Sequence, residues 1–204
     1  MNAIAHIVDD DPAVRDALRW LLQSRSVGSK AWSSGEDFLA AATPDLFGCC
    51  LLDVRMPGMS GIELFDRLRT AHCPIPVIFL TGHGDVPMAV KALKDGAFDF
   101  IEKPYDDNAL VDKVLAAFAH DERRNAKAES ANQVRHRLAQ LTQRETEVMQ
   151  RILGGKLNKM IADELGIAMR TVEVHRSHIF EKMHVRSAVE LSQLLGTLPD
   201  TAES

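Results

Sequence analysis

The chain has 204 residues, of which 46% are hydrophobic and 26% are charged, and its formal net charge at pH 7 is −5. This hydrophobic content excludes a wholly disordered chain, and the length suits two small domains better than one compact α/β unit. No apolar run approaches the roughly 20 residues that a membrane-spanning helix needs, and the amino terminus lacks the pattern of a secretory signal. We therefore expect a cytoplasmic protein without a membrane partner.

Charge is distributed unevenly along the chain. Residues 1–134 carry 14 basic and 20 acidic groups, whereas residues 135–204 carry 10 and 9. The two parts should therefore meet different partners. Because the second part is close to neutral, a nucleic-acid function there must rest on a motif and not on charge.

The cysteines and histidines do not indicate a disulfide framework or a zinc site. Cys49 and Cys50 are adjacent and Cys73 follows at a distance, a spacing that predicts buried thiols in a reducing compartment. The eight histidines are scattered without a paired helical spacing.

Short apolar runs alternate with amphipathic segments through the first 120 residues. Such alternation predicts a doubly wound parallel sheet of about five strands and five helices. The strands are expected at 3–8, 29–32, 49–53, 77–80 and 98–101, and the first four helices at 13–23, 35–42, 61–71 and 86–94.

Polar residues stand where four of these strands end. Asp53 ends a buried apolar run, Asp9 and Asp10 follow the first strand, Thr81 follows the fourth, and Lys103 follows the last. Taken alone, Asp53 could merely cap the turn after its strand. In an open parallel sheet, however, the carboxyl ends of the strands converge on one rim, where ligands bind.

Three carboxylates on one rim would repel one another unless a cation lies between them. Hard oxygen ligands that leave room for water and a phosphoryl group suit Mg²⁺. Lys103 adds a positive charge and Thr81 a hydroxyl group. The set can bind and transfer a phosphoryl group, with a carboxylate as the nucleophile.

These motifs resemble the receiver domain of bacterial two-component response regulators, in the FixJ-like branch of the NarL/FixJ family. The resemblance covers about residues 3–120 and rests on Asp9-Asp10, Asp53 followed by Met56-Pro57-Gly58, Thr81-Gly82 and Lys103-Pro104. It implies a flavodoxin-like fold in which Asp53 accepts a phosphoryl group from a partner sensor histidine kinase.

The same resemblance assigns the other residues of the rim. Asp10 would bind Mg²⁺ directly and Asp9 largely through water, together with Asp53 and the backbone carbonyl of Arg55. Thr81 and Lys103 would hold phosphoryl oxygens.

Phe100 occupies the place of the aromatic that, in the family, changes rotamer when the threonine moves toward the phosphate. As plain chemistry, Phe100 is equally a core residue, and the two roles are compatible.

The remaining chain is predicted to be a linker followed by a small helical unit. Residues 121–137 are polar, alanine-rich and free of Pro and Gly, which is typical of a linker that can be helical. Thr142 and Glu145 form the sequence of a capping box. Four helices are expected. The first runs from the capping box to about residue 153, and the others lie at 158–165, 169–183 and 187–195.

This stretch, about residues 138–197, resembles the LuxR-type helix-turn-helix. The motifs are Leu141-Thr142-x-Arg144-Glu145, Asn158-Lys159-x-Ile161-Ala162, Thr171-Val172-x-x-His175 and Lys182-Met183. One departure is Ala168, where the family usually has Ser, and the lost cap costs about 1 kcal/mol.

By this resemblance, the helix that begins at Met169 enters the major groove of promoter DNA. The candidates for reading bases are Glu173, Val174 and Ser177, and those for phosphate contact are Lys159, Arg170, Thr171, Arg176 and Lys182. For each charged residue, a solvated helix face is the plain alternative. Because the cations are few, two copies on a paired site are expected.

The sequence therefore predicts a transcription regulator and not an enzyme, although its receiver would assist its own phosphoryl transfer and dephosphorylation. Phosphorylation would promote a homodimer that acts on promoter DNA and the transcription machinery. The predicted limits are 1–120 for the receiver, 121–137 for the linker, 138–197 for the helix-turn-helix and 198–204 for a tail.

Two rival functions remain at this point. A phosphatase of the haloacid-dehalogenase type would need a second Asp two residues after the nucleophile, where this chain has Arg55. A regulator with a protein or RNA output would keep the receiver but would not bind promoter DNA.

Overall fold

The computed structural model describes residues 3–82 and 86–198, without the side chains of Val86, Pro87 and Ala89. The predicted tail, apart from Leu198, lies outside the described residues. The chain divides into two compact units, residues 1–125 and 126–204, which are described separately. Among the described helices, none is both long and apolar enough to cross a membrane.

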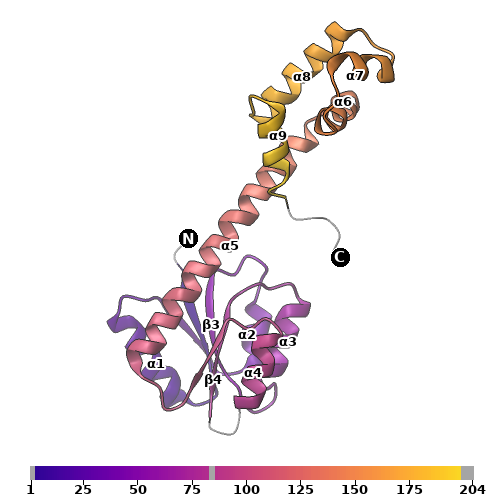
Figure 1. The fold of residues 1–204 in the computed structure, drawn as a ribbon. Helices are drawn as coiled ribbons and strands as arrows, with labels where there is room; N and C mark the ends of the chain where they lie inside the picture. Colours follow the sequence, from indigo (N-terminus) through magenta and orange to yellow (C-terminus); the bar gives the residue numbers. More distant parts are fainter. Residues whose placement is uncertain (1–2, 83–85, 199–204) are drawn as a thin grey trace. The chain divides into compact units, whose positions relative to one another are not determined.

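A parallel sheet forms the centre of the first unit (Figure 1). Its strand order is β2-β1-β3-β4-β5, so that β3 lies in the middle. All six residues of β3 are buried, as expected for a strand that is covered on both faces. The bounds are β1 (Ile4–Val8), β2 (Ser29–Trp32), β3 (Gly48–Asp53), β4 (Val77–Thr81) and β5 (Asp99–Glu102).

Helices cover both faces of this sheet and create two hydrophobic cores (Figure 1). One core lies under α2, α3 and α4, and the other under α1 and the first part of α5. The doubly wound α/β fold predicted from the sequence is therefore confirmed. The bounds are α1 (Pro12–Ser24), α2 (Gly35–Ala41), α3 (Gly61–Thr70), α4 (Val86–Lys94) and α5 (Asp107–Ala139).

The second unit is a helical bundle with its own core. Its helices are α6 (Gln143–Leu153), α7 (Asn158–Leu165), α8 (Met169–Met183) and α9 (Ala188–Leu195). Both halves of the predicted capping box between Thr142 and Glu145 are present. Ala168 precedes α8 without a side-chain cap, as its sequence implied. The core is made mainly by Val134, Val148, Ile152, Ile161, Val172, Ile179, Met183 and Leu191.

Helix α5 is 33 residues long and contains the division between the units, after Asn125. Residues 121–137, which the sequence predicts to be a linker, are helical throughout. The domain limits inferred from the sequence stay a prediction.

The turn after β3 requires a glycine at the start of α3. Ser60 caps this helix, and a Cβ added to Gly61 would lie 2.1 Å from the backbone oxygen of Asp53. That backbone cannot yield without moving Asp53, because β3 is paired with β1 and β4 on its two sides. The close approach of the two segments thus fixes the position of the residue that ends β3.

We predict that Gly61→Ala lowers the free energy of unfolding of the first unit by about 1–3 kcal/mol, since the added methyl group overpacks against backbone. Gly28→Ala is the control, because its Cβ would meet its nearest neighbour at 3.8 Å. Urea unfolding followed by tryptophan fluorescence reports this unit alone, as Trp20 and Trp32 are the two tryptophans of the chain. Equal stability of the two variants would contradict the prediction.

Candidate functional site

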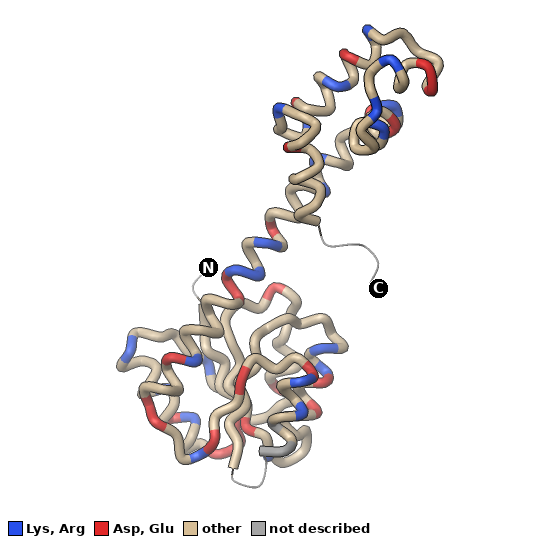
Figure 2. Tube along the Cα trace, in the orientation of Figure 1, with Lys and Arg blue, Asp and Glu red and all other residues tan. Residues whose placement is uncertain are grey.

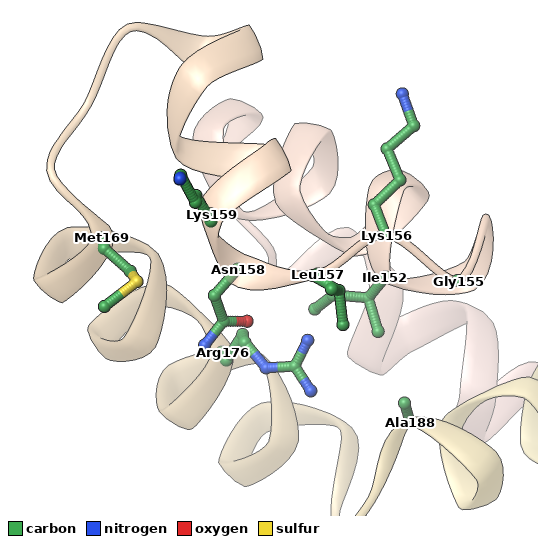
Figure 3. A pocket seen from close by; sticks show the side chains of 9 residues that line it. All are labelled: Ile152, Gly155, Lys156, Leu157, Asn158, Lys159, Met169, Arg176 and Ala188. Atoms are coloured by element: carbon green, nitrogen blue, oxygen red, sulfur yellow. The ribbon is translucent and has the colours of Figure 1, made fainter.

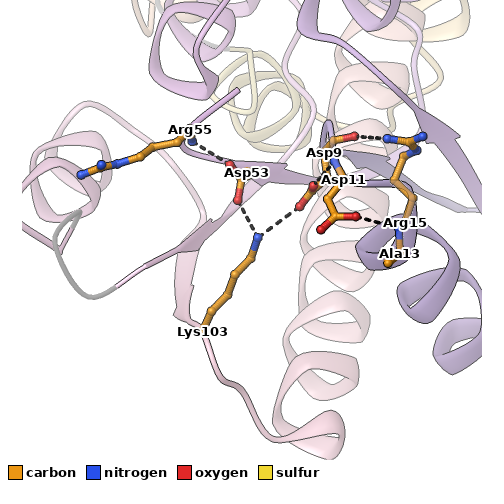
Figure 4. A network of polar contacts seen from close by, with 7 residues as sticks. All are labelled: Asp9, Asp11, Ala13, Arg15, Asp53, Arg55 and Lys103. Carbon is orange, nitrogen blue, oxygen red and sulfur yellow. Dashed lines mark hydrogen bonds and ion pairs between the residues drawn. The ribbon is translucent and has the colours of Figure 1, made fainter. Parts of the chain in front are cut away.

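Asp53 lies at the carboxyl end of the central strand, and its two oxygens have different partners (Figure 4). Oδ1 accepts a hydrogen bond from Lys103 Nζ at 2.6 Å, and Oδ2 accepts one from the backbone N–H of Arg55 at 2.7 Å. The residue is 9% exposed, so its carboxylate lies at the rim of the sheet and not deep in the core.

Asp9, the residue that follows β1, joins the same network. Its Oδ2 accepts a hydrogen bond from Lys103 Nζ at 3.1 Å, and its Oδ1 accepts one from the backbone N–H of Asp11 at 2.9 Å. The backbone carbonyl of Asp9 also accepts a hydrogen bond from Arg15 at 2.7 Å, a contact that the sequence analysis missed. Asp10, in contrast, is exposed. The structure thus brings Asp9, Asp53 and Lys103 together.

Thr81 is completely buried at the end of β4, and its hydroxyl donates to the carbonyl of Gly82 at 3.2 Å. Its neighbour Leu80 is the register partner of Asp53, so Thr81 stands one residue further toward the rim. Phe100 is half-buried on β5, opposite Phe79, and packs against the core under α2–α4. This placement gives Phe100 its core role; the switch role stays a prediction.

Burial and charge oppose each other at Asp53. Burial raises the pKa of the Asp53 carboxyl, and Asp9 raises it further, while Lys103 and the N–H of Arg55 lower it; the balance leaves it above its ordinary value. For Lys103, burial lowers the pKa, but the two carboxylates outweigh burial and raise it. The site therefore holds a firmly charged ammonium beside a carboxylate of raised basicity, and a basic carboxylate is the better nucleophile.

The donor set suits Mg²⁺ in chemistry, because carboxylate and backbone carbonyl oxygens are its preferred protein ligands. In the described part of the chain, however, no three His, Cys, Asp or Glu side chains gather closely enough to hold a metal ion. The Lys103 ammonium stands between Asp9 and Asp53 and offsets part of their negative charge. Binding of a divalent cation there would have to rearrange this ion pair.

The predicted DNA contacts lie on the second unit, where basic and acidic positions are interspersed along the helices (Figure 2). Most of these residues are exposed, as a contact surface requires. The exposed ones are Lys159, Arg170, Thr171, Glu173, Val174 and Ser177. Arg170 and Glu173 form an ion pair at 3.2 Å on the surface of α8.

Arg176 is half-buried and lies over the ring of Phe180 at 5.3 Å. Its guanidinium extends into a pocket of about 500 Å³, beside the amide of Asn158 (Figure 3). Lys156, which the sequence analysis did not single out, borders the same pocket and pairs with Glu164. The complete lining is Ile152, Gly155, Lys156, Leu157, Asn158, Lys159, Met169, Arg176 and Ala188.

Lys182 differs from the other candidates because its ammonium pairs with a buried carboxylate. Nζ lies 2.6 Å from Oε2 of Glu145, which is 3% exposed, and also donates to the carbonyl of Gln140 at 3.3 Å. The same Glu145 oxygen accepts hydrogen bonds from Thr142. Sequence reasoning found the cap but not this pair, because 37 residues separate its members.

The fold and the two sites define a class of protein. A parallel α/β sheet with two carboxylates and a lysine at one rim, followed in the chain by a helix-turn-helix unit, is the architecture of a two-component response regulator. Residues 5–115 match the family described as "Response regulator receiver domain", and residues 139–195 match "Bacterial regulatory proteins, luxR family". The chain belongs to the NarL/FixJ family of response regulators, with a receiver and a LuxR-type DNA-binding domain.

Relatives support this assignment over nearly the whole chain. The C4-dicarboxylate transport transcriptional regulatory protein DctR of Rhodobacter capsulatus is 50% identical, covering 95% of this chain and 100% of the relative. The transcriptional regulatory protein FixJ of Azorhizobium caulinodans is 43% identical, and the match covers 93% of this chain and 90% of the relative. The solved structure of the response regulator StyR is 41% identical with a TM-score of 0.88, covering 96% and 99%.

We predict that Glu145→Gln destabilises the second unit by about 1–3 kcal/mol, since it leaves the Lys182 ammonium without a charged partner. Burial raises the pKa of Glu145, but the hydrogen bonds from Lys182 and Thr142 outweigh it and hold the pKa below the ordinary 4.5. The ionised carboxylate therefore stabilises the fold above pH 4.5, and this contribution declines as the pH falls through the folded-state pKa.

Urea unfolding followed by circular dichroism measures this effect. The relevant transition is that of the second unit, which tryptophan fluorescence does not report because both tryptophans lie in the first unit. Glu147→Gln is the matched control, because its ion pair with Arg144 is about one-third exposed on both sides and contributes less than about 1 kcal/mol. A difference between wild type and Glu145→Gln that does not shrink below pH 4.5 would contradict the assignment.

Proposed function

We propose that this regulator accepts a phosphoryl group on Asp53 from a sensor histidine kinase and then binds promoter DNA. The single observation that carries the proposal is the contact of Asp53 with Lys103, shared with Asp9, at the rim of the sheet. The family assignment supports both halves of the function, since it joins a receiver to a LuxR-type domain.

In the proposed transfer, a carboxylate oxygen of Asp53 attacks the phosphorus of the kinase phosphohistidine. The P–N bond breaks, a P–O bond forms, and the imidazole leaves with its electron pair. Asp53 needs no general base, because its carboxylate is already ionised. Lys103 contacts the carboxylate before transfer and afterwards stabilises the added negative charge of the phosphoryl oxygens.

Asp9, Asp10, Asp53 and the carbonyl of Arg55 are the residues that would hold Mg²⁺. When bound, the ion neutralises charge on the phosphoryl group. Thr81 would donate its hydroxyl to a phosphoryl oxygen in place of its present acceptor, the carbonyl of Gly82. That change of partner would be the first step of the switch, with Phe100 following it.

The proposed output is a homodimer that binds a paired promoter site through α8 in the cytoplasm and acts on the transcription machinery. Exposure of Glu173, Val174 and Ser177 on one helix supports their role in reading bases. Two copies are needed because each supplies few phosphate contacts. Since Lys182 already pairs with Glu145, its contact with DNA would add a partner to this ion pair or replace it.

Replacement of the phosphoacceptor tests the first half of the proposal. We predict that Asp53→Asn reduces acid-labile phosphorylation by acetyl phosphate and Mg²⁺ to background, because an amide is not a nucleophile for phosphorus. Asp66→Asn, an exposed change on α3, is expected to keep wild-type stoichiometry. Quantification of acid-labile phosphate checks both, and normal labelling of Asp53→Asn would refute the assignment.

Replacement of exposed residues on α8 tests the second half. Arg170→Ala should weaken binding to all DNA sequences alike and reduce the slope of log affinity against log salt by about 1, as expected for one lost phosphate contact. Val174→Ala should instead change the preferred base at one position, by about 1–3 kcal/mol.

Affinities measured over a series of salt concentrations and base substitutions distinguish these outcomes. Lys127→Ala, an exposed change on α5, is the control and should alter neither quantity. If both α8 variants behave like the control, the output of the second unit is not DNA binding through α8.

A further inference from the structure

The amino-terminal end of β3, opposite the end that carries Asp53, has an unusual hydrogen-bond partner. Two residues into the strand, the N–H of Cys50 donates to the carbonyl of Pro76 on the β4 side at 2.8 Å. Residues two apart in a strand direct their N–H groups to the same side. The N–H of Gly48 therefore also faces the β4 side, but β4 begins only at Val77, which is the partner of Cys50.

The missing strand partner is replaced by a side chain from α5. Oδ2 of Asp121 accepts the hydrogen bond from the Gly48 N–H at 2.9 Å. Gly48 cannot be exchanged for a larger residue, because its φ is +132° and an added Cβ would lie 2.0 Å from the carbonyl oxygen of Ile4. The backbone at this corner is therefore fixed from the β1 side as well.

Asp121 is completely buried, which is unusual for a carboxylate without a structural or functional reason. Its Oδ1 forms an ion pair with Arg124, whose Nη2 lies 2.6 Å away, and Asn125 donates to Oδ2 at 3.5 Å. Burial raises the pKa of Asp121, while Gly48 and Arg124 favour the ionised form. Three groups thus converge on one buried carboxylate.

The position of Asp121 on α5 gives this cluster its significance. Leu110, Val114 and Ala117 form the buried stripe of α5 on the sheet, and Asp121 continues that stripe one turn further. The next buried residue along the helix is Ala131, which belongs to the second unit. Asp121 is therefore the last buried residue of α5 within the first unit, and the division between the units follows four residues later.

We propose that Asp121 is a positioning residue that anchors the root of the linker helix to the phosphoacceptor strand and thereby couples phosphorylation of Asp53 to DNA binding. Asp53 and the Gly48 N–H lie at the two ends of the same six-residue strand. A change at Asp53 that shifts β3 reaches α5 through a buried charged contact, which, unlike an apolar contact, loses much energy when its geometry is disturbed.

The inference rests on the proposed function for its coupling, but the anchor itself can be tested independently. Hydrogen exchange of the unphosphorylated full-length protein measures it directly. Asp121→Ala should increase amide exchange in residues 118–130 and at Gly48, while residues 107–116 stay protected by their apolar contacts. Glu122→Ala, at the exposed neighbouring position, should leave all of these rates unchanged.

Coupling is measured as the ratio of DNA affinities of the phosphorylated and unphosphorylated forms. Asp121→Ala should keep the wild-type stoichiometry of acetyl phosphate labelling and the wild-type DNA affinity of the unphosphorylated form. Its affinity ratio, however, should be at least about fivefold smaller than that of the wild type, which is the lower range of allosteric coupling. Asp121→Asn retains an acceptor for the Gly48 N–H without the charge, and its affinity ratio should lie between those of the wild type and Asp121→Ala.

The outcomes separate this inference from the proposed function. A wild-type protein without any gain on phosphorylation refutes the proposed function and with it the coupling. If the wild type gains affinity on phosphorylation and Asp121→Ala retains that gain in full, the inference alone is refuted. A parallel loss of labelling and of unphosphorylated DNA affinity in Asp121→Ala also refutes the inference alone, because it would indicate a general folding defect. Should Asp121→Ala fail to fold, Asp121→Asn and Arg124→Gln replace it, and a full gain in both overturns the inference.

Discussion

The ammonium group of Lys103, held between the carboxylates of Asp9 and Asp53, is the interaction on which the candidate receiver site depends. Two carboxylates at the rim of a buried sheet repel each other, and a cation between them offsets part of that repulsion. Lys103 supplies this cation before any metal or phosphoryl group arrives. The resting site thus holds two carboxylates and one ammonium, and a ligand must compete with Lys103 for the same oxygens.

The parallel topology explains why this site could be predicted from the sequence. In a doubly wound sheet the strand ends meet at one rim, so Asp9, Asp53 and Lys103 needed only to be recognised as strand ends. The apolar runs made that possible, although β5 begins one residue later than its pattern indicated. The capping box at Thr142 and Glu145 was equally readable, because its partners are three residues apart. The phosphatase rival loses its support, since the relatives named above are transcriptional regulators.

Contacts between residues far apart in the chain could not be predicted in this way. The partner of Lys182 is Glu145, and only the crossing of α6 and α8 brings them together. Arg176 was predicted only as a candidate for phosphate contact, and its approach to the ring of Phe180 and its place beside Asn158 in the pocket became visible only in the structure. Asp121 had the polar surroundings of a linker, and nothing in those neighbours reveals that Gly48, paired with Ile4 of β1, lacks a partner on the β4 side. Periodicity indicates which face a residue occupies, but not what lies opposite that face.

The two buried carboxylates associated with β3 can be compared directly. Asp53 is held by Lys103 at the rim, where a ligand can reach it, whereas Asp121 is held by Arg124 and Gly48 with no exposed surface at all. In the proposed function, the first would change its partners when Asp53 is phosphorylated, whereas the second can only keep or lose the partners that it has. In the proposed coupling, a strand fixed at one end and chemically changed at the other would transmit strain toward its fixed end, because a packed core resists gradual deformation. Rigidity at Asp121 is thus what would let a change at Asp53 reach the linker helix.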